Sequence, residues 1–172
     1  MFRDMRRKKQ ALSDQECIDV LKRGEWGVLG VQGDDGYPYT VPLNYVFHEG
    51  SIFFHCAREG HKIDALKRSD KASFCVVDRS DLATSTFTTH YSSVIVFGRL
   101  RIIESQEERS RALVALVEAL AGNESEDDKH AELDRCWMRN SLEMLELVPE
   151  HISGKQAKEL VGKPDGQHPT TL

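Results

Sequence analysis

Apolar and polar residues alternate with a period of two along much of the chain, and this pattern predicts β-strands. Pro38 and Pro42 interrupt the second run, so we expect that strand at a sheet edge, or bulged where the prolines fall. Gly98 lies inside another run and suggests a bulge or a sharp bend. The predicted strands are WGVLGVQ (26–32), YPYTVPLNYVFH (37–48), SIFFHCA (51–57), KASFCVVD (71–78), HYSSVIVFGRLRIIES (90–105) and LEMLELVPEHI (142–152).

Other segments follow the helical period. In SDQE, Ser13 and Glu16 have the form of a capping box that begins a helix, and Gly24 ends it. A short helix is expected from Gly60 to about Ser69. Two more are expected in EERSRALVALVEALAG (107–122) and DDKHAELDRCWMRN (127–140), whereas the polar stretch DRSDLATSTFTT (78–89) is predicted to be a loop.

This order of elements does not alternate as βαβ units do. Closely spaced strands with tight turns predict an antiparallel sheet that curls into a barrel, with helices packed outside it. The fold class is therefore mainly β with flanking helices. We expect a basic N-terminal arm at residues 1–12, one domain at 13–155 and a mobile C-terminal tail at 156–172.

The composition is that of a soluble globular protein, with 40% hydrophobic and 30% charged residues. A net charge of -5 argues against a surface built for nucleic acid, although the basic arm could contact nucleic acid, a partner subunit or a phosphate. No signal peptide or apolar run of membrane-spanning length is present, so we expect a cytoplasmic protein. Its scattered cysteines read as reduced core residues, and no segment has metal-ligand spacing.

The segment FFHCAREGHKIDALKR (53–68) gathers positive charge where a strand gives way to a helix. A helix N-terminus favours anions, and Gly60 permits close backbone approach. If Arg58, His61 and Lys62 converge there, they suit one dianionic phosphate. The alternative is that these side chains are solvated residues of an ordinary loop.

A longer run, GDDGYPYTVPLNYVFHEGSIFFHCAREGHKIDALKRSDKASFCVVD, resembles the flavin-binding core of the pyridoxamine 5'-phosphate oxidase-related split barrels. Within that group it is most similar to proteins linked to 5-nitroimidazole resistance. YSSVIVFGRLRII and the opening MFRDMRRKKQ match the same family, so the resemblance covers about residues 1 to 155. It implies a six-stranded antiparallel split β-barrel and a homodimer, with FMN in a cleft at the subunit interface.

The resemblance also implies a set of cofactor-binding residues. One strand would lie along the isoalloxazine ring, the next would line the flavin, the helix start with Arg58 would hold the phosphate, and a second subunit would complete the cleft. The strand along the ring would supply Val41, Pro42, Leu43 and Asn44, and the strand that lines the flavin would supply Phe54, His55, Cys56 and Ala57. The helix start would supply Gly60, His61 and Lys62, and the second subunit would supply Tyr91, Ser93 and Trp137.

His55 is the candidate catalytic residue, since a neutral histidine beside a flavin can donate a hydrogen bond or move a proton. A core histidine satisfied by a carbonyl is the alternative, and His61 competes for the role. The implied function is that of an FMN-dependent oxidoreductase acting on small electron-poor substrates such as 5-nitroimidazoles. Alternatives are a non-catalytic flavin-binding or sensing protein, or a split barrel that binds haem or a deazaflavin.

Overall fold

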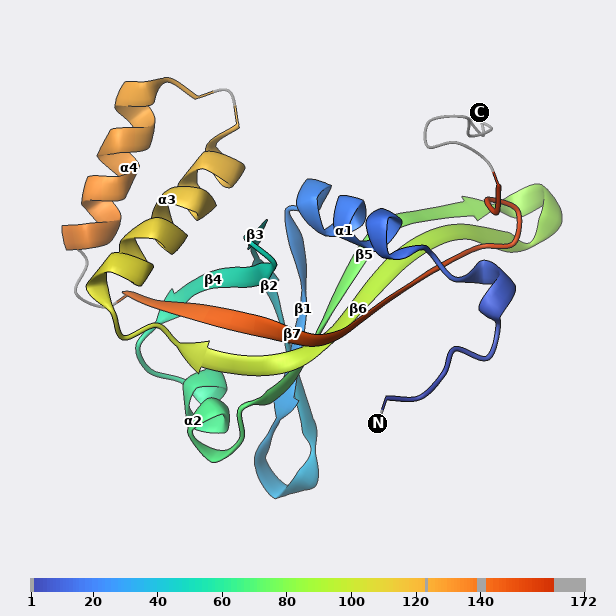
Figure 1. The fold of residues 1–172 in the computed structure, drawn as a ribbon, viewed down its shortest axis with the longest axis horizontal. Coiled ribbons are helices and arrows are strands. Elements are labelled where there is room, and N and C mark those ends of the chain that lie inside the picture. The colour runs from blue at the N-terminus through green and yellow to red at the C-terminus, as the bar shows by residue number, and fades with distance from the viewer. Residues whose placement is uncertain (1, 123, 139–141, 163–172) are drawn as a thin grey trace.

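The structure, a computed structural model, describes residues 2–122, 124–138 and 142–162, with the backbone alone at 136–138. Within these residues one antiparallel sheet has seven strands in the order β2-β1-β5-β6-β7-β4-β3. The strands are β1 (Trp26–Gln32), β2 (Pro38–Asn44), β3 (Val46–His48), β4 (Ser51–Ala57), β5 (Lys71–Ala83), β6 (Thr88–Ile102) and β7 (Leu142–Gln156). Helices flank this sheet, so the predicted fold class, mainly β with flanking helices, is confirmed (Figure 1).

The expected count of six strands is wrong, because the run at 37–48 divides at Tyr45 into β2 and β3. The Tyr45 hydroxyl donates to the Leu21 carbonyl at 2.9 Å, and its backbone N–H donates to the Glu25 carbonyl at 3.2 Å. These bonds replace ladder pairing at this residue and let the chain leave one strand for another.

Although β2 and β3 are the two edges of the sheet, only Tyr45 separates them in sequence. The sheet must therefore curl until its edges approach each other, which produces an open, split barrel. β2 is an edge strand, as Pro38 and Pro42 predict.

The barrel encloses an aromatic core. Phe74 meets both Tyr45 and Phe54 edge-on, with ring centroids 5.0 Å apart in each pair. Helix α1 (Asp14–Arg23) covers one end of this core with Cys17, Val20 and Leu21. The predicted capping box begins the helix and Gly24 caps its C-terminus, so both predictions are confirmed.

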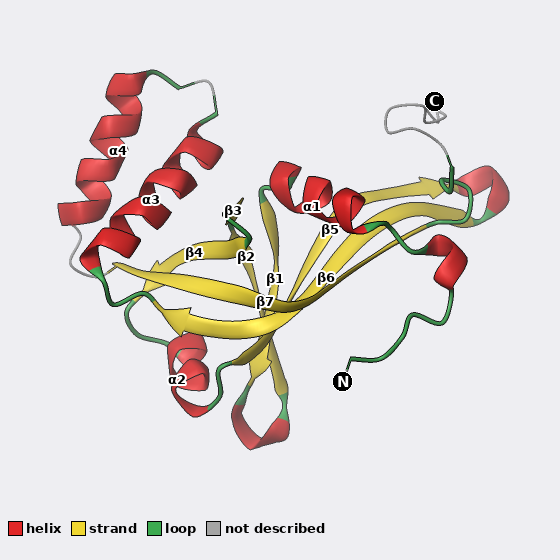
Figure 2. Cartoon of the chain, in the orientation of Figure 1, coloured by secondary structure: helices red, strands yellow, loops and turns green. Residues whose placement is uncertain are grey.

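The segment at 78–83, predicted as part of a loop, continues β5 instead, so that prediction is wrong. β5 and β6 form a long hairpin that extends away from α3 and α4 (Figure 2). Its register shifts between Val77 and Arg79, as in a β-bulge. There the Asp78 carboxylate accepts two hydrogen bonds from Arg23 of α1, at 2.6 and 2.8 Å. Backbone pairing with β6 holds this polar segment in the sheet.

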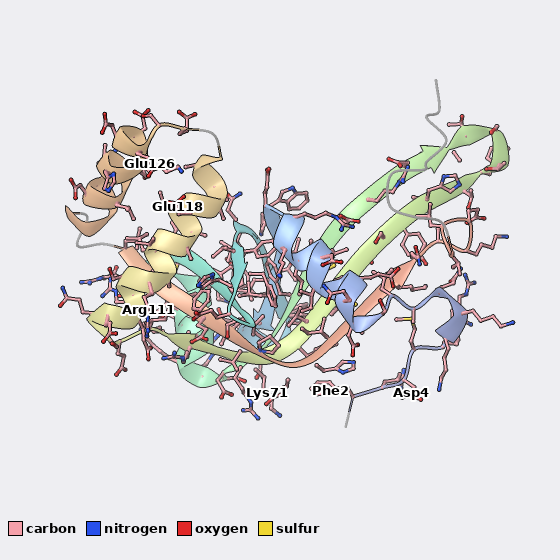
Figure 3. The ribbon with its side chains drawn as sticks, turned by 45° about the horizontal axis from the view of Figure 1, so that its top comes forward. Phe2, Asp4, Lys71, Arg111, Glu118 and Glu126 are labelled. Carbon is pink, nitrogen blue, oxygen red and sulfur yellow. The ribbon has the colours of Figure 1, made fainter. Side chains whose placement is uncertain are left out.

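Helices α3 (Gln106–Ala121) and α4 (Glu126–Met138) lie side by side and form a second, smaller core against the sheet. Lys129 joins them, with Nζ 3.0 Å from Glu118 and 2.9 Å from Glu126. Figure 3 labels both carboxylates on their neighbouring helices. The buried side chains of this core include Leu113, Leu116 and Met144.

β7 pairs with β6 on one side and with β4 on the other. The β6–β7 register shifts beside Gly98, which confirms the predicted bulge. A Cβ atom at Gly98 would lie 2.1 Å from the Val148 carbonyl oxygen, so the close approach of the two strands requires glycine.

The N-terminal arm folds back onto the sheet. Phe2 stacks on His151 of β7, with centroids 4.8 Å apart, and a 3₁₀ turn, η1 (Lys8–Gln10), follows. After β7, Ala157 and Leu160 are buried, whereas 163–172 of the predicted tail lie outside the described residues. In the described part of the chain, no helix combines the length and hydrophobicity that a membrane crossing requires.

Candidate functional site

The strand-to-helix turn leads from β4 into α2 (His61–Arg68). Gly60 precedes the helix with φ 123° and ψ 171°, a conformation that side-chain-bearing residues rarely adopt. No heavy atom comes within 4 Å of a Cβ built at this glycine. The backbone at the start of α2 is thus open to a ligand, as phosphate binding requires.

The charges around this turn do not converge as the sequence suggested. Arg58 Nε lies 2.9 Å from Glu143 of β7, and His61 Nε2 lies 3.3 Å from Asp34 in the turn between β1 and β2. His61 also stacks on Tyr39, with centroids 4.0 Å apart. Among the described residues Lys62 has no ion-pair partner, so it is the cation available at the start of α2.

β4 sends alternate side chains to opposite sides. Phe54 and Cys56 are buried in the barrel core, whereas His55 and Ala57 face outward. Burial lowers the pKa of His55 below its usual value; Glu132 opposes this effect and Lys62 reinforces it. His55 is therefore a neutral imidazole at pH 7, able to donate or accept a proton.

Burial also raises the pKa of the Cys56 thiol, an effect that Lys62 opposes and Glu143 adds to. The thiol form of Cys56 is therefore favoured, and it contributes to packing rather than to nucleophilic chemistry.

His55 opens into a cavity of about 450 Å³ between β4 and the two outer helices. The side chains that α3 contributes to the lining are aliphatic, whereas those of α4 are charged. We call this space the His55 cavity; it is lined by His55, Leu113, Leu116, Val117, Leu120, Ala121, Glu124, Asp128, Lys129, Glu132 and Arg135. An apolar space with one neutral imidazole suits a small molecule of low charge.

The predicted ring-binding strand, β2, alternates in the same way as β4. Val41 and Leu43 pack against the barrel core, while Pro42 and Asn44 are exposed. The Asn44 amide donates to the Glu25 carbonyl at 3.1 Å. Val41 and Leu43 can thus meet a surface ligand only through their backbone, and Pro42 and Asn44 only on the outer face.

The residues assigned to a second subunit lie elsewhere. Tyr91 and Ser93 belong to the β5–β6 hairpin, which points away from α2 (Figure 1), so a single chain does not bring them to this turn. The Trp137 side chain lies outside the described residues. Tyr91 lines a second space of about 840 Å³, with Arg6, Arg7, Lys8, Lys9, Gln10, Thr88, Thr89, Ala157, Lys158 and Glu159; we call it the cationic hollow.

Sequence reasoning missed the α3 and α4 side chains of the His55 cavity. The available signal was the width of the apolar surface of α3, where Leu113 and Leu116 are buried but Val114 and Leu120 remain exposed. A helix that packs against its neighbours on a single side has a narrower apolar stripe than α3 has. Gln10 and the hairpin threonines of the cationic hollow carried no comparable signal.

A family model described as pyridoxamine 5'-phosphate oxidase matches residues 13–156 of the chain. Among curated proteins, no match was found.

Solved structures share the fold. The conserved hypothetical protein Rv2991 of Mycobacterium tuberculosis is 22% identical, with TM-score 0.76 and 98% of both chains covered. A provisionally assigned 5-nitroimidazole antibiotic resistance protein of Bacteroides thetaiotaomicron VPI-5482 is 18% identical, with TM-score 0.70, covering 85% of this chain and 86% of that one. The FAD and heme binding protein of Mycobacterium smegmatis is 16% identical, with TM-score 0.66, covering 87% and 74%. At these identities the likeness shows the fold alone.

Proposed function

The chain belongs to the pyridoxamine 5'-phosphate oxidase family, and from that premise we propose that it binds FMN and reduces small electron-poor molecules such as 5-nitroimidazoles. One observation carries the proposal. Lys62 at the start of α2 lies close enough to His55 to help lower its pKa, and His55 in turn opens into the cavity of about 450 Å³ between β4 and the two outer helices. Phosphate binding, proton transfer and substrate binding thus have candidate groups in one place.

Gly60 and Lys62 are the groups that fit a flavin phosphate. The left-handed backbone at Gly60 leaves the first N–H groups of α2 accessible, and Lys62 adds a cation that no described carboxylate neutralises. Arg58 and His61 already have acidic partners, so they support the turn by holding it to β7 and to the β1–β2 hairpin. Lys62 would therefore provide most of the charge-assisted binding.

The outer edge of β2 and the outward residues of β4 are the proposed surface for the flavin ring. Val41 and Leu43 would offer backbone groups, and His55 and Ala57 would offer side chains. FMN, when bound, supplies two-electron transfer to the substrate. His55 would relay a proton from water to the reduced substrate, because a neutral imidazole can accept a proton on one ring nitrogen as it releases one from the other.

A second copy of the chain is the proposed partner. The outer face of the sheet carries exposed apolar side chains, among them Val77, Ile95 and Phe97, next to small ones such as Gly30 and Ser73. An apolar face of this kind suits isologous pairing with its own copy. In such a homodimer Tyr91, Ser93 and Trp137 would be the contributions of the second copy to the flavin cleft.

The proposal is tested by the visible absorbance of the purified protein after incubation with FMN and removal of the excess. We expect flavin bands that remain with the protein, and reoxidation of the reduced protein by a 5-nitroimidazole without oxygen. His55→Gln should retain the flavin and slow this reoxidation by about 10²- to 10⁴-fold. The matched control is His48→Gln, because His48 is an exposed histidine of β3.

Each other outcome contradicts a defined part of the proposal. Flavin that stays bound but is not reoxidised would indicate a non-catalytic flavin-binding protein. A Soret band would indicate haem instead, and a protein that retains no FMN would remove Lys62 and Gly60 from any flavin site.

A further inference from the structure

The cationic hollow lies where the N-terminal arm meets the turn end of the β5–β6 hairpin and the segment after β7. Its volume of about 840 Å³ is within the range of small-molecule sites. Arg6, Arg7 and Lys9 of the arm line one side, and Thr88, Thr89 and Lys158 line the other. The hairpin that holds it points away from α2 (Figure 1).

The arm is held at both ends of its basic segment. At the first end, Phe2 stacks on His151, 4.8 Å away, and on Phe97, 5.5 Å away. At the second, Leu12 N–H donates to the Gly154 carbonyl at 3.0 Å. Figure 3 labels Phe2 and Asp4 on the segment that leads from the first of these contacts to the hollow. The cations are therefore placed before any ligand arrives, which lowers the entropy cost of binding.

No described carboxylate pairs with three of the five cations around the hollow. Lys8 pairs with Asp4 at 2.9 Å, and Lys158 lies 3.7 Å from Glu159. Among the described residues Arg6, Arg7 and Lys9 have no ion-pair partner. Like charges gathered at a concave site repel one another, and an anion with more than one negative charge relieves that repulsion.

Gln10 is a second, independent sign of a ligand. Its side chain lines the hollow but is only 8% exposed, and its Oε1 has no hydrogen-bond partner among the described residues. A buried amide oxygen without a donor is costly, and native proteins rarely leave one unsatisfied. As placed, this oxygen can accept from a ribose hydroxyl, and with the amide turned over the N–H₂ group takes its place and can donate to a phosphate oxygen.

We propose that the cationic hollow, which in a single chain lies away from Gly60 and Lys62 at the start of α2 (Figure 1), binds the diphosphate group of a nucleotide-sized small molecule. Tyr91 is the residue that the hollow would share with the flavin cleft of the proposed homodimer. Arg6 and Arg7 would bind phosphate oxygens through paired N–H groups, Lys9 would add a third charge, and Gln10 would complete the set. A small molecule fits better than a nucleic acid strand, because the site is concave and no aromatic side chains alternate with the basic residues of the arm.

The test is calorimetric titration of the full-length, FMN-saturated protein with inorganic pyrophosphate and, separately, with ADP. We expect saturable binding of one pyrophosphate per chain. Arg6→Gln/Arg7→Gln should weaken it by at least about tenfold, and Gln10→Leu by a smaller factor. The control, Arg3→Gln/Lys22→Gln, removes the same two charges outside the hollow and should leave the affinity within about twofold.

The ADP titration identifies the source of the diphosphate. Tighter binding of ADP than of pyrophosphate would mean that the nucleoside is also recognised, and equal binding that recognition ends at the phosphates; both support the site. No binding of either probe, or equal losses in both double variants, would overturn it. So would pyrophosphate binding only in flavin-free protein, since the hollow would then serve the FMN phosphate, or tighter binding of a short single-stranded oligonucleotide than of ADP.

Discussion

The His55 cavity and the cationic hollow differ in the kind of side chain that forms most of their walls. The first is walled by aliphatic side chains of α3 that also build a core, and it holds its one histidine neutral. The second is walled by exposed arginine and lysine side chains of an arm that contributes little to any core. Changes to the apolar lining of the first site should therefore alter the stability of the fold, whereas the second site should respond mainly to the salt concentration.

The largest contrast is expected in stability. Leu116→Ala removes a buried wall of the His55 cavity and should lower the free energy of unfolding by about 2–5 kcal/mol. Arg7→Ala, in the wall of the cationic hollow, should change it by about 0.5 kcal/mol or less. Urea denaturation of the two variants measures both effects, and similar losses would mean that the arm belongs to the folded core.

Flavin affinity should depend on one cation beside the His55 cavity. Lys62→Ala is expected to weaken FMN binding by about ten- to a hundredfold, or about 1.5–3 kcal/mol, because one charge-assisted contact is lost. Lys67→Ala, a change on the same helix at a lysine that pairs with Asp64, is the control. Equilibrium dialysis with FMN measures the affinity; equal losses in both variants would exclude a specific role of Lys62. Pyrophosphate binding at the cationic hollow should not change in either.

A pH effect should come from the His55 cavity, because arginine and lysine of the hollow stay charged at neutral pH. The folded pKa of His55 is lowered by burial, so below about 6.5 the unfolded chain binds more protons at this residue. Its contribution to stability is therefore lost as the pH falls through that value and is regained above it. Unfolding measured at pH 5.5 and 7.5 should show a smaller difference in His55→Gln than in wild type or His48→Gln; an unchanged difference would mean that the fold does not lower the pKa of His55.

Salt should produce the smallest effect, and at the hollow alone. Removing like charges with Arg6→Gln/Arg7→Gln should stabilise the protein by about 0.5 kcal/mol or less at low ionic strength. This gain should vanish at about 1 M salt, where the Debye length is about 3 Å. Thermal unfolding at two salt concentrations measures it, and a gain that persists at high salt would mean that the two arginines are strained for another reason.

Local signals predicted the parts of the fold that short segments determine. The capping box at Ser13 and Glu16, the edge position of β2 with its two prolines, and the bulge beside Gly98 each depend on a few neighbouring residues. The β5 segment after Asp78 could not be predicted in this way. Because this segment does not face the barrel core, its residues do not alternate between apolar and polar. It is a strand because its backbone pairs with β6.

The sequence predicted which segment holds the candidate site residues, but not how their side chains are arranged in space. A helix does begin after Gly60, as expected, whereas the positive φ of this glycine was not predicted. The partners of Arg58 and His61, namely Glu143 and Asp34, are distant in sequence, so their separation from Lys62 could not be read from spacing. Alternation along β4 indicated that His55 opposes Phe54, but not that α3 and α4 would enclose it.

The position of β7 between β4 and β6 determines how the chain can be made. Among the described strands β7 is synthesised last, so from the completion of β6 until β7 is made, the edges of β4 and β6 that it covers have no partner. Such edges recruit strands from other chains. A product that stops before Leu142 therefore has no strand with which to cover either edge.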